Sequence, residues 1–110
     1  MAAAEVASFL ERSRPGNCGK TREAVAESSA ACKRHELGAA LLPGRVYMSW
    51  RSLAAACVDF CQRCERCRFI SISPTYRDCS WYARCEVDNL AQSPHGFRSY
   101  AMTAQTTKMK

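Results

Sequence analysis

Hydrophobic and polar positions repeat with two different periods along this chain. Over residues 51–66, apolar side chains and cysteines recur at helical spacing on one stripe while charged side chains mostly point away, which predicts an amphipathic helix. Residues 67–73, CRFISIS, are rich in β-branched and aromatic side chains and predict a strand. Residues 79–87, CSWYARCEV, alternate with a period of two and predict a second strand. The intervening SPTYRD predicts a turn that joins the two strands into a hairpin.

Shorter patterns lie on both sides of this unit. Residues 1–14 predict a helix that ends at a Pro-Gly pair, and residues 21–37 predict a second helix that a glycine stops. Alternation over residues 45–50, RVYMSW, predicts a strand, and residues 97–103 predict another. The order of strand, helix and three strands indicates the α+β class, with an antiparallel sheet packed against one central helix.

A chain of 110 residues is one domain by size. The sequence patterns that predict structure are weaker in the N-terminal part of the chain than in the rest. The weakly apolar residues 1–42 are interpreted as an N-terminal helical extension with a looser attachment, residues 43–104 as the cysteine-rich domain, and residues 105–110 as a flexible basic tail. No stretch reaches the roughly 20 apolar residues that a membrane-spanning helix needs.

The hairpin predicts where its cysteines lie. If Ser73 and Cys79 close the turn, antiparallel pairing places Cys67 opposite Cys85. The hairpin cysteines then share one face with Trp81, and that face receives the helix with its cysteine stripe. Six cysteines are therefore expected to converge on one layer, namely Cys57, Cys61, Cys64, Cys67, Cys79 and Cys85.

The eight cysteines favour disulfides, because the count is even and the density is close to that of disulfide scaffolds. Cys57 and Cys61 do not bond each other easily, since Cβ atoms one helical turn apart lie about 5–6 Å from each other and a bridge needs about 3.5–4.5 Å. Cys79 and Cys85 lie about 20 Å apart along a strand, so each needs its own partner. Helix-to-sheet bridges satisfy both constraints, and many pairings remain open.

The spacing of these cysteines also resembles a known family. A helix carries CxxxC, a cysteine precedes an aromatic strand residue by two, and a cysteine precedes a large apolar residue of the next strand by two (Cys57 and Cys61; Cys67 and Phe69; Cys79 and Trp81). Over residues 44–103 this pattern resembles the PAN/apple domain. The resemblance implies a five-stranded antiparallel sheet that cradles one helix, the core bridges Cys57–Cys79 and Cys61–Cys67, and an extracellular module that binds proteins or carbohydrates.

Four cysteines lie outside that core pattern. Cys64 and Cys85 are expected to form a third bridge, and Cys18 and Cys32 a fourth, unless they stay free. The first residues lack the uninterrupted apolar run of a secretory signal. The cysteines nonetheless favour an extracellular compartment or the lumen of the secretory pathway.

Charge adds one candidate surface. The formal net charge of +6 favours anionic partners, but the arginines of the central helix alternate with acidic residues, which favours a solvated surface over a nucleic-acid site. Tyr82 is expected on the face opposite Trp81, where it forms a candidate ligand-binding patch with Arg84 and Arg68. The expected partner is a protein or a glycan, and the oligomeric state is left open.

Zinc is the alternative to disulfides. In a reducing compartment the thiolates of Cys61, Cys64 and Cys67, with Cys85 or alternatively Cys79 as the fourth, are candidate tetrahedral ligands. That chain would be an intracellular zinc-stabilised interaction domain, or a small accessory subunit of a larger assembly. Apart from zinc, no cofactor is expected.

Catalytic motifs are incomplete. CVDFCQRC also resembles the cluster-binding motif of radical S-adenosylmethionine enzymes, but here it lies on a predicted helix, whereas that family carries it in a loop. GNCGKT lacks the first glycine of a phosphate-binding loop, because Arg14 stands there. Two isolated histidines offer few candidates for a general base. The sequence therefore predicts a non-catalytic binding module, with a cysteine-cluster or redox protein as the enzyme alternative.

Overall fold

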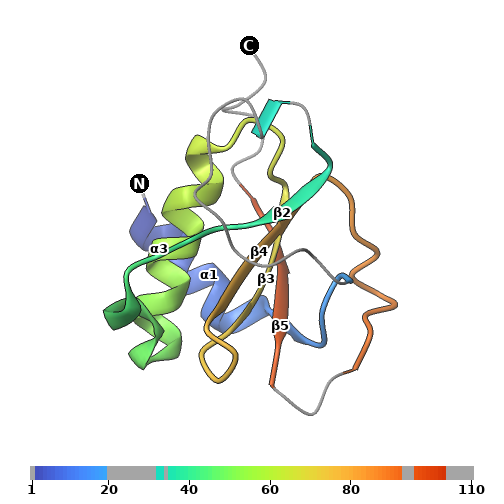
Figure 1. Cartoon of the computed structure of the whole chain (residues 1–110). Helices are drawn as coiled ribbons and strands as arrows, with labels where there is room; N and C mark the ends of the chain where they lie inside the picture. The colour runs from blue at the N-terminus through green and yellow to red at the C-terminus, as the bar shows by residue number, and fades with distance from the viewer. Residues whose placement is uncertain (1, 20–31, 34, 93–95, 104–110) are drawn as a thin grey trace.

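The computed structural model describes residues 2–19, 32–33, 35–92 and 96–103, and within them it forms a small α+β domain. Two helices, α1 (Ala2–Arg12) and α3 (Trp50–Arg63), pack on one face of a five-stranded antiparallel sheet (Figure 1). The sheet has the order β1-β5-β3-β4-β2, with strands β1 (Arg14–Pro15), β2 (Leu37–Ala39), β3 (Phe69–Ser73), β4 (Asp78–Tyr82) and β5 (Arg98–Ala101). The predicted class and the antiparallel sheet are confirmed.

Helix α3 forms as its sequence pattern predicts. Ser49 caps its N-terminus, because the hydroxyl accepts a hydrogen bond from the backbone N–H of Ser52 at 3.1 Å. The buried stripe faces the sheet and consists of Leu53, Ala54, Cys57, Val58 and Cys61. The helix ends at Arg63, three residues before the expected end, and Cys64 is its C-terminal cap.

The strand predicted over residues 45–50 is wrong, because this segment is the 3-10 helix η1 (Gly44–Met48) followed by the capping residue Ser49 and by Trp50, the first residue of α3. Local bonds replace strand pairing. The N–H of Val46 donates to the carbonyl of Pro43 at 3.1 Å, and the hydroxyl of Ser52 donates to the carbonyl of Val46 at 2.7 Å. Alternation over so few residues does not separate a strand from a tight turn with one side packed on the core.

The hairpin of β3 and β4 is offset by one residue from the predicted register. Ser73 pairs with Asp78, whereas Cys79 was the expected partner. The turn holds four residues and ends at Arg77, whose φ of 54° lies in the left-handed region. Because a shift of one residue exchanges the two faces of one strand relative to the other, Ile70 and Ile72 share the helix side with Cys79 and Trp81.

Strand β4 is shorter than the alternation of residues 79–87 predicts, since it ends at Tyr82. Its alternation does not separate a buried face from an exposed one, because every residue from Cys79 to Tyr82 is buried. The N-terminal segment covers the second face: the N–H of Cys18 donates to the Ser71 hydroxyl at 2.9 Å, and the Tyr82 hydroxyl donates to the Gly19 carbonyl at 2.5 Å.

The described part of residues 1–42 is not loosely attached. Helix α1 packs its buried Val6 and Phe9 into the core, β1 pairs with β5, and β2 pairs with β4. Most of the helix expected over residues 21–37 lies outside the described residues, but its expected end is wrong, because Leu37 lies in β2. The predicted tail, residues 105–110, also lies outside them.

Four disulfides cross-link the domain. Cys57–Cys79 and Cys61–Cys67 agree with the resemblance, whereas the other two bridges are Cys32–Cys64 and Cys18–Cys85 and correct the expected pairing. The reason is the side of the sheet on which each cysteine lies. Cys64 lies in the helix-side core, whereas Cys85 follows β4 and bonds to Cys18 on the other face. Cys32 therefore takes the place expected for Cys85 in the layer of six.

Candidate functional site

The ligand patch predicted from Tyr82, Arg84 and Arg68 is not an aromatic surface in this structure. Tyr82 lies on the face opposite Trp81, as expected, but only 3% of it is exposed. Arg84 is exposed, with its Nε atom 3.7 Å from a carboxylate oxygen of Glu36. Arg68 is half-buried. The patch thus keeps the positive charges of its two arginines, but the ring of Tyr82 is not accessible to a ligand.

Tyr82 belongs to a buried polar layer. The hydroxyls of Ser71 and Ser99 lie 2.6 Å apart, and the hydroxyl of Ser99 donates to the carbonyl of Gly16 at 2.8 Å. These bonds hold the N-terminal segment against the sheet, together with the Tyr82 bond to the carbonyl of Gly19. The serines that alternate along β3 therefore support the fold.

Burial raises the pKa of Tyr82 from 10.0 to about 12, although hydrogen bonds to Ser71 and Ser80 act in the opposite direction. Below pH 10 the tyrosine is protonated in both states, so it adds no pH dependence. Between pH 10 and 12 the unfolded chain ionises and the folded chain does not, so stability falls as pH rises. At about 1.4 kcal/mol per pKa unit, we expect a loss of roughly 2–3 kcal/mol by pH 12.

Chemical denaturation at pH 8 and pH 11.5 measures this loss. Tyr82→Phe should cost about 1 kcal/mol at pH 8, because the Gly19 carbonyl loses its donor, and it should show a smaller further loss at pH 11.5 than the wild type. Burial also raises the pKa values of Tyr47 and Tyr100, so some alkaline loss remains in the variant. Equal losses in both proteins would contradict the assignment to Tyr82.

The candidate zinc ligands are divided between disulfides. Cys61 is bonded to Cys67, while Cys64 and Cys85 each bond to a cysteine outside the candidate set. Among the described residues, no group of three or more potential ligands converges on a point. Zinc binding by these four cysteines therefore requires their bridges to be reduced.

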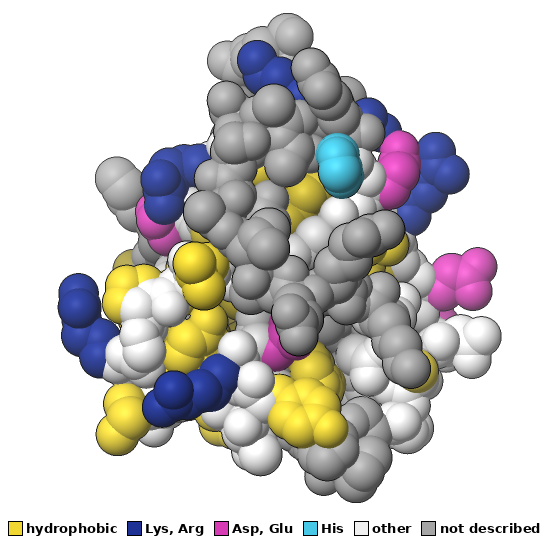
Figure 2. Space-filling model, viewed as in Figure 1, with side chains coloured by type: hydrophobic (Ala, Val, Ile, Leu, Met, Phe, Trp, Pro, Cys, Tyr) yellow, Lys and Arg dark blue, Asp and Glu magenta, His cyan; other side chains and the backbone are white. Residues whose placement is uncertain are grey.

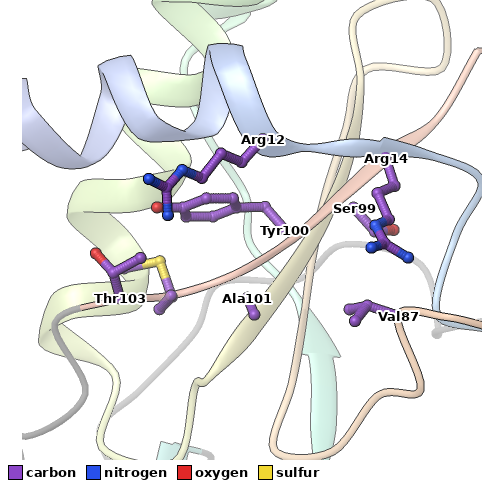
Figure 3. A pocket seen from close by; sticks show the side chains of 8 residues that line it. Arg12, Arg14, Val87, Ser99, Tyr100, Ala101 and Thr103 are labelled. Atoms are coloured by element: carbon purple, nitrogen blue, oxygen red, sulfur yellow. The ribbon is translucent and has the colours of Figure 1, made fainter.

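A hollow of about 310 Å³ lies where helix α1 ends beside β1 and β5, and it is the candidate ligand site (Figure 3). The local cause is the shortness of β1. It pairs with β5 only at Arg98 and Ser99, so the edge of β5 beyond Ser99 has no neighbouring strand there. Ala101 and Thr103 line the hollow from this edge, and Val87 lines it from the segment after β4.

Two guanidinium groups lie at the hollow. The Arg12 side chain extends beside the ring of Tyr100, and the Arg14 side chain extends toward Val87 (Figure 3). Arg14 forms an ion pair of 2.5 Å with Asp88. Arg12 is exposed and forms no ion pair or side-chain hydrogen bond with another described residue, so its donors are available to a ligand.

A buried carboxylate fixes the side of the hollow next to α1. Glu5 is 5% exposed and accepts hydrogen bonds from the Tyr100 hydroxyl at 2.6 Å, from the Thr103 N–H at 2.7 Å and from the Thr103 hydroxyl at 2.7 Å. Burial and the bond to Glu5 raise the pKa of Tyr100. The Tyr100 hydroxyl is thus committed as a donor inside the fold, and the Tyr100 ring also makes a T-shaped contact with the Phe9 ring, with centroids 5.5 Å apart.

The lining of the hollow is suited to binding. It combines the donors of two arginines with apolar side chains, and none of its eight residues is a cysteine, histidine, lysine or acid. It accommodates a small group that carries hydrogen-bond acceptors or negative charge beside an apolar part. Sequence patterns did not reveal it, because Arg12 and Arg14 lie more than 80 residues before the strand they approach, and nothing local in the chain indicates that contact.

The fold defines this protein as a small disulfide-rich α+β domain, and its four bridges are consistent with an oxidising, extracellular environment. No family model, curated protein or solved structure matches the chain. No helix in the described part of the chain is long and apolar enough to cross a membrane.

Proposed function

We propose that this protein is a non-catalytic binding module of the PAN/apple type that recognises a protein or carbohydrate ligand in an extracellular or lumenal compartment. The observation that supports it is the placement of the bridges. Cys57–Cys79 ties helix α3 to the sheet, and Cys18–Cys85 ties the N-terminal segment to the chain that follows β4. Both segments that border the hollow, residues 12–18 and 85–88, are thus anchored.

Preorganisation is the mechanism. A ligand that enters the hollow meets side chains on a cross-linked backbone, so little ordering entropy is lost on binding. Arg12 and Arg14 supply charge-assisted hydrogen bonds, and Val87 and Met102 supply apolar contact. The ligand that fits best carries a carboxylate, sulfate or similar acceptor group next to an apolar surface.

The bridges are tested first, by alkylating the protein without reduction and measuring its intact mass and metal content. Eight unreactive cysteines and no metal support the module. Free thiols with bound zinc would instead support the alternative, an intracellular zinc-stabilised interaction domain. In that case a chelator should destabilise the protein and a reductant should not.

Ligand binding is tested on an array of neutral, sialylated and sulfated glycans and on a panel of secreted ectodomains. We expect binders that carry an anionic group, and Arg12→Gln/Arg14→Gln should weaken them by roughly tenfold or more, since a hydrogen bond to a charged group contributes about 1.5–3 kcal/mol. Arg63→Gln is the matched control, because Arg63 is exposed and pairs with Asp59 on α3. If Arg84→Gln weakened ligand binding and Arg12→Gln/Arg14→Gln did not, the binding site would instead be the patch of Tyr82, Arg84 and Arg68 predicted from the sequence.

A further inference from the structure

A second surface combines exposed apolar side chains with arginines. Leu41, Met48 and Tyr76 are large apolar residues that are 62%, 79% and 51% exposed. Arg45 lies in η1, Arg51 in the first turn of α3, and Arg77 in the β3–β4 turn. We call these six residues the basic pole, which shares no residue with the hollow.

The segments of the basic pole lie together at one end of the molecule. Tyr47 links η1 to the β3–β4 turn, because it lies in η1 and packs against the core. Burial raises the pKa of its hydroxyl most, and the charges of Arg77 and Asp78 from the hairpin also act on it. In Figure 1, η1, the start of α3 and the β3–β4 turn lie side by side along the lower edge. Figure 2 shows hydrophobic and basic side chains mixed over the same lower left part of the surface.

Acidic residues are scarce at this end. Residues 37–58 and 70–77, which form this end of the molecule and the elements that lead to it, contain no aspartate or glutamate, and their charged residues are Arg45, Arg51 and Arg77. The acid that follows, Asp78, is partly buried, and its carboxylate accepts a hydrogen bond from the Ser80 hydroxyl at 2.5 Å. Among the described residues, Arg45, Arg51 and Arg77 form no ion pair, so the basic pole presents net positive charge around its exposed apolar side chains.

We propose that the basic pole docks this protein on the surface of membranes that contain anionic lipids. Met48 and Leu41 would enter the boundary between headgroups and acyl chains, and Arg45, Arg51 and Arg77 would contact lipid phosphates and carboxylates. This activity is independent of ligand binding in the hollow.

The shape and composition of the basic pole favour a lipid surface over an acidic protein. Leu41 and Met48 lie in the segment from β2 to the end of η1 and are mostly exposed, and Tyr76 of the β3–β4 turn is half exposed beside Phe97. The anchors of a protein partner, in contrast, are usually held in well-packed pockets. Arginines that flank exposed apolar residues, with Tyr47 and Trp50 partly exposed between them, match the arrangement by which peripheral proteins insert a short apolar tip while the charges stay at the headgroups.

Vesicle co-sedimentation tests the proposal. The intact oxidised protein should bind to vesicles of phosphatidylcholine mixed with phosphatidylserine and should bind much less to vesicles of phosphatidylcholine alone. Binding to the mixed vesicles should weaken as the salt concentration increases. Each arginine near an anionic surface contributes about 1 kcal/mol, so Arg45→Gln/Arg51→Gln should weaken binding by roughly 25-fold. Met48→Ser should weaken it independently of salt.

Two variants guard against effects of misfolding. Arg77→Gly removes a charge at a φ of 54°, where glycine is favoured, so it should weaken binding about fivefold without loss of stability. Arg63→Gln lies outside the basic pole and should leave binding unchanged. No binding to either vesicle, equal binding to both, or an equal loss with Arg63→Gln would overturn the proposal, and binding to polyglutamate in place of vesicles would assign the surface to an acidic protein.

Discussion

Replacing both Cys57 and Cys79 by alanine should lower the free energy of unfolding by roughly 3–5 kcal/mol. The bridge joins the buried stripe of α3 to strand β4, and both cysteines are almost fully buried. Its loss has two costs. The unfolded chain gains the freedom of a loop closed over 22 positions, and the core loses two sulfur atoms that no other side chain replaces.

The matched variant is Cys18→Ala/Cys85→Ala. That bridge closes a longer loop, over 67 positions, but both of its cysteines are only half-buried. Loop entropy alone predicts a larger loss for the longer loop. We expect the opposite order, because the other bridges already restrict the unfolded chain and only the Cys57–Cys79 variant opens a cavity in the core.

Guanidinium unfolding of both variants at one pH distinguishes these causes, provided that the slope with denaturant is analysed along with the midpoint. A greater loss for Cys57→Ala/Cys79→Ala supports packing as the dominant contribution. The reverse order would show that chain entropy dominates and that the core tolerates the missing sulfur atoms.

The elements that could be predicted are those with long or regular patterns. Helix α3 follows from its apolar stripe and β3 from its β-branched run, and both are in the structure close to their expected positions. Segment 45–50 was too short for its alternation to be specific, so η1 was missed. Strand β2 was missed because its glycine, Gly38, resembles a helix stop.

The disulfide pairing shows how one local error propagates. The alternation of residues 79–87 places Cys85 on the face of Cys79 and Trp81 only if the strand continues that far, and β4 ends at Tyr82. Cys85 was therefore expected beside the helix, where Cys64 could reach it, but it lies on the opposite side with Cys18. The two bridges implied by the PAN/apple resemblance do not depend on the length of β4 beyond Tyr82, and both are present.

The candidate site could not be predicted for a different reason. The hollow is formed where β1 ends beside β5, and it brings Arg12 and Arg14 to residues 99–103. Two arginines in a weakly patterned segment are typical of a solvated surface. Only the pairing of β1 with β5 brings both arginines to the same hollow, and the paired strands lie near opposite ends of the sequence.

Trp81 should be the most sensitive apolar residue of the sheet. It is fully buried in β4, between Ile70 of β3 and Gly38 of β2. Trp81→Ala should cost roughly 3–5 kcal/mol, because the large cavity collapses only in part. Trp81→Phe should cost much less than that, since the buried indole N–H has no hydrogen-bond partner among the residues that the structure describes, and its removal offsets part of the lost volume.

Gly38 allows a sharper test of this packing. A Cβ atom at Gly38 would lie 2.7 Å from the indole nitrogen of Trp81 and 3.0 Å from its Cε2 atom, so Gly38→Ala forces the indole or β2 to shift. We expect a loss of roughly 1–3 kcal/mol. In a Trp81→Phe background much of that loss should disappear, because the smaller ring leaves room for the methyl group.

Denaturant unfolding of the two single variants and the double variant completes the cycle. A coupling energy of about 1 kcal/mol or more, with the double variant more stable than the sum of the single losses predicts, would establish direct contact between β2 and the indole. Additive losses would instead mean that β2 does not lie over Trp81, and that Gly38 acts only through its own backbone. The glycine that resembles a helix stop in the sequence is thus the residue whose substitution best tests the sheet edge that the sequence does not predict.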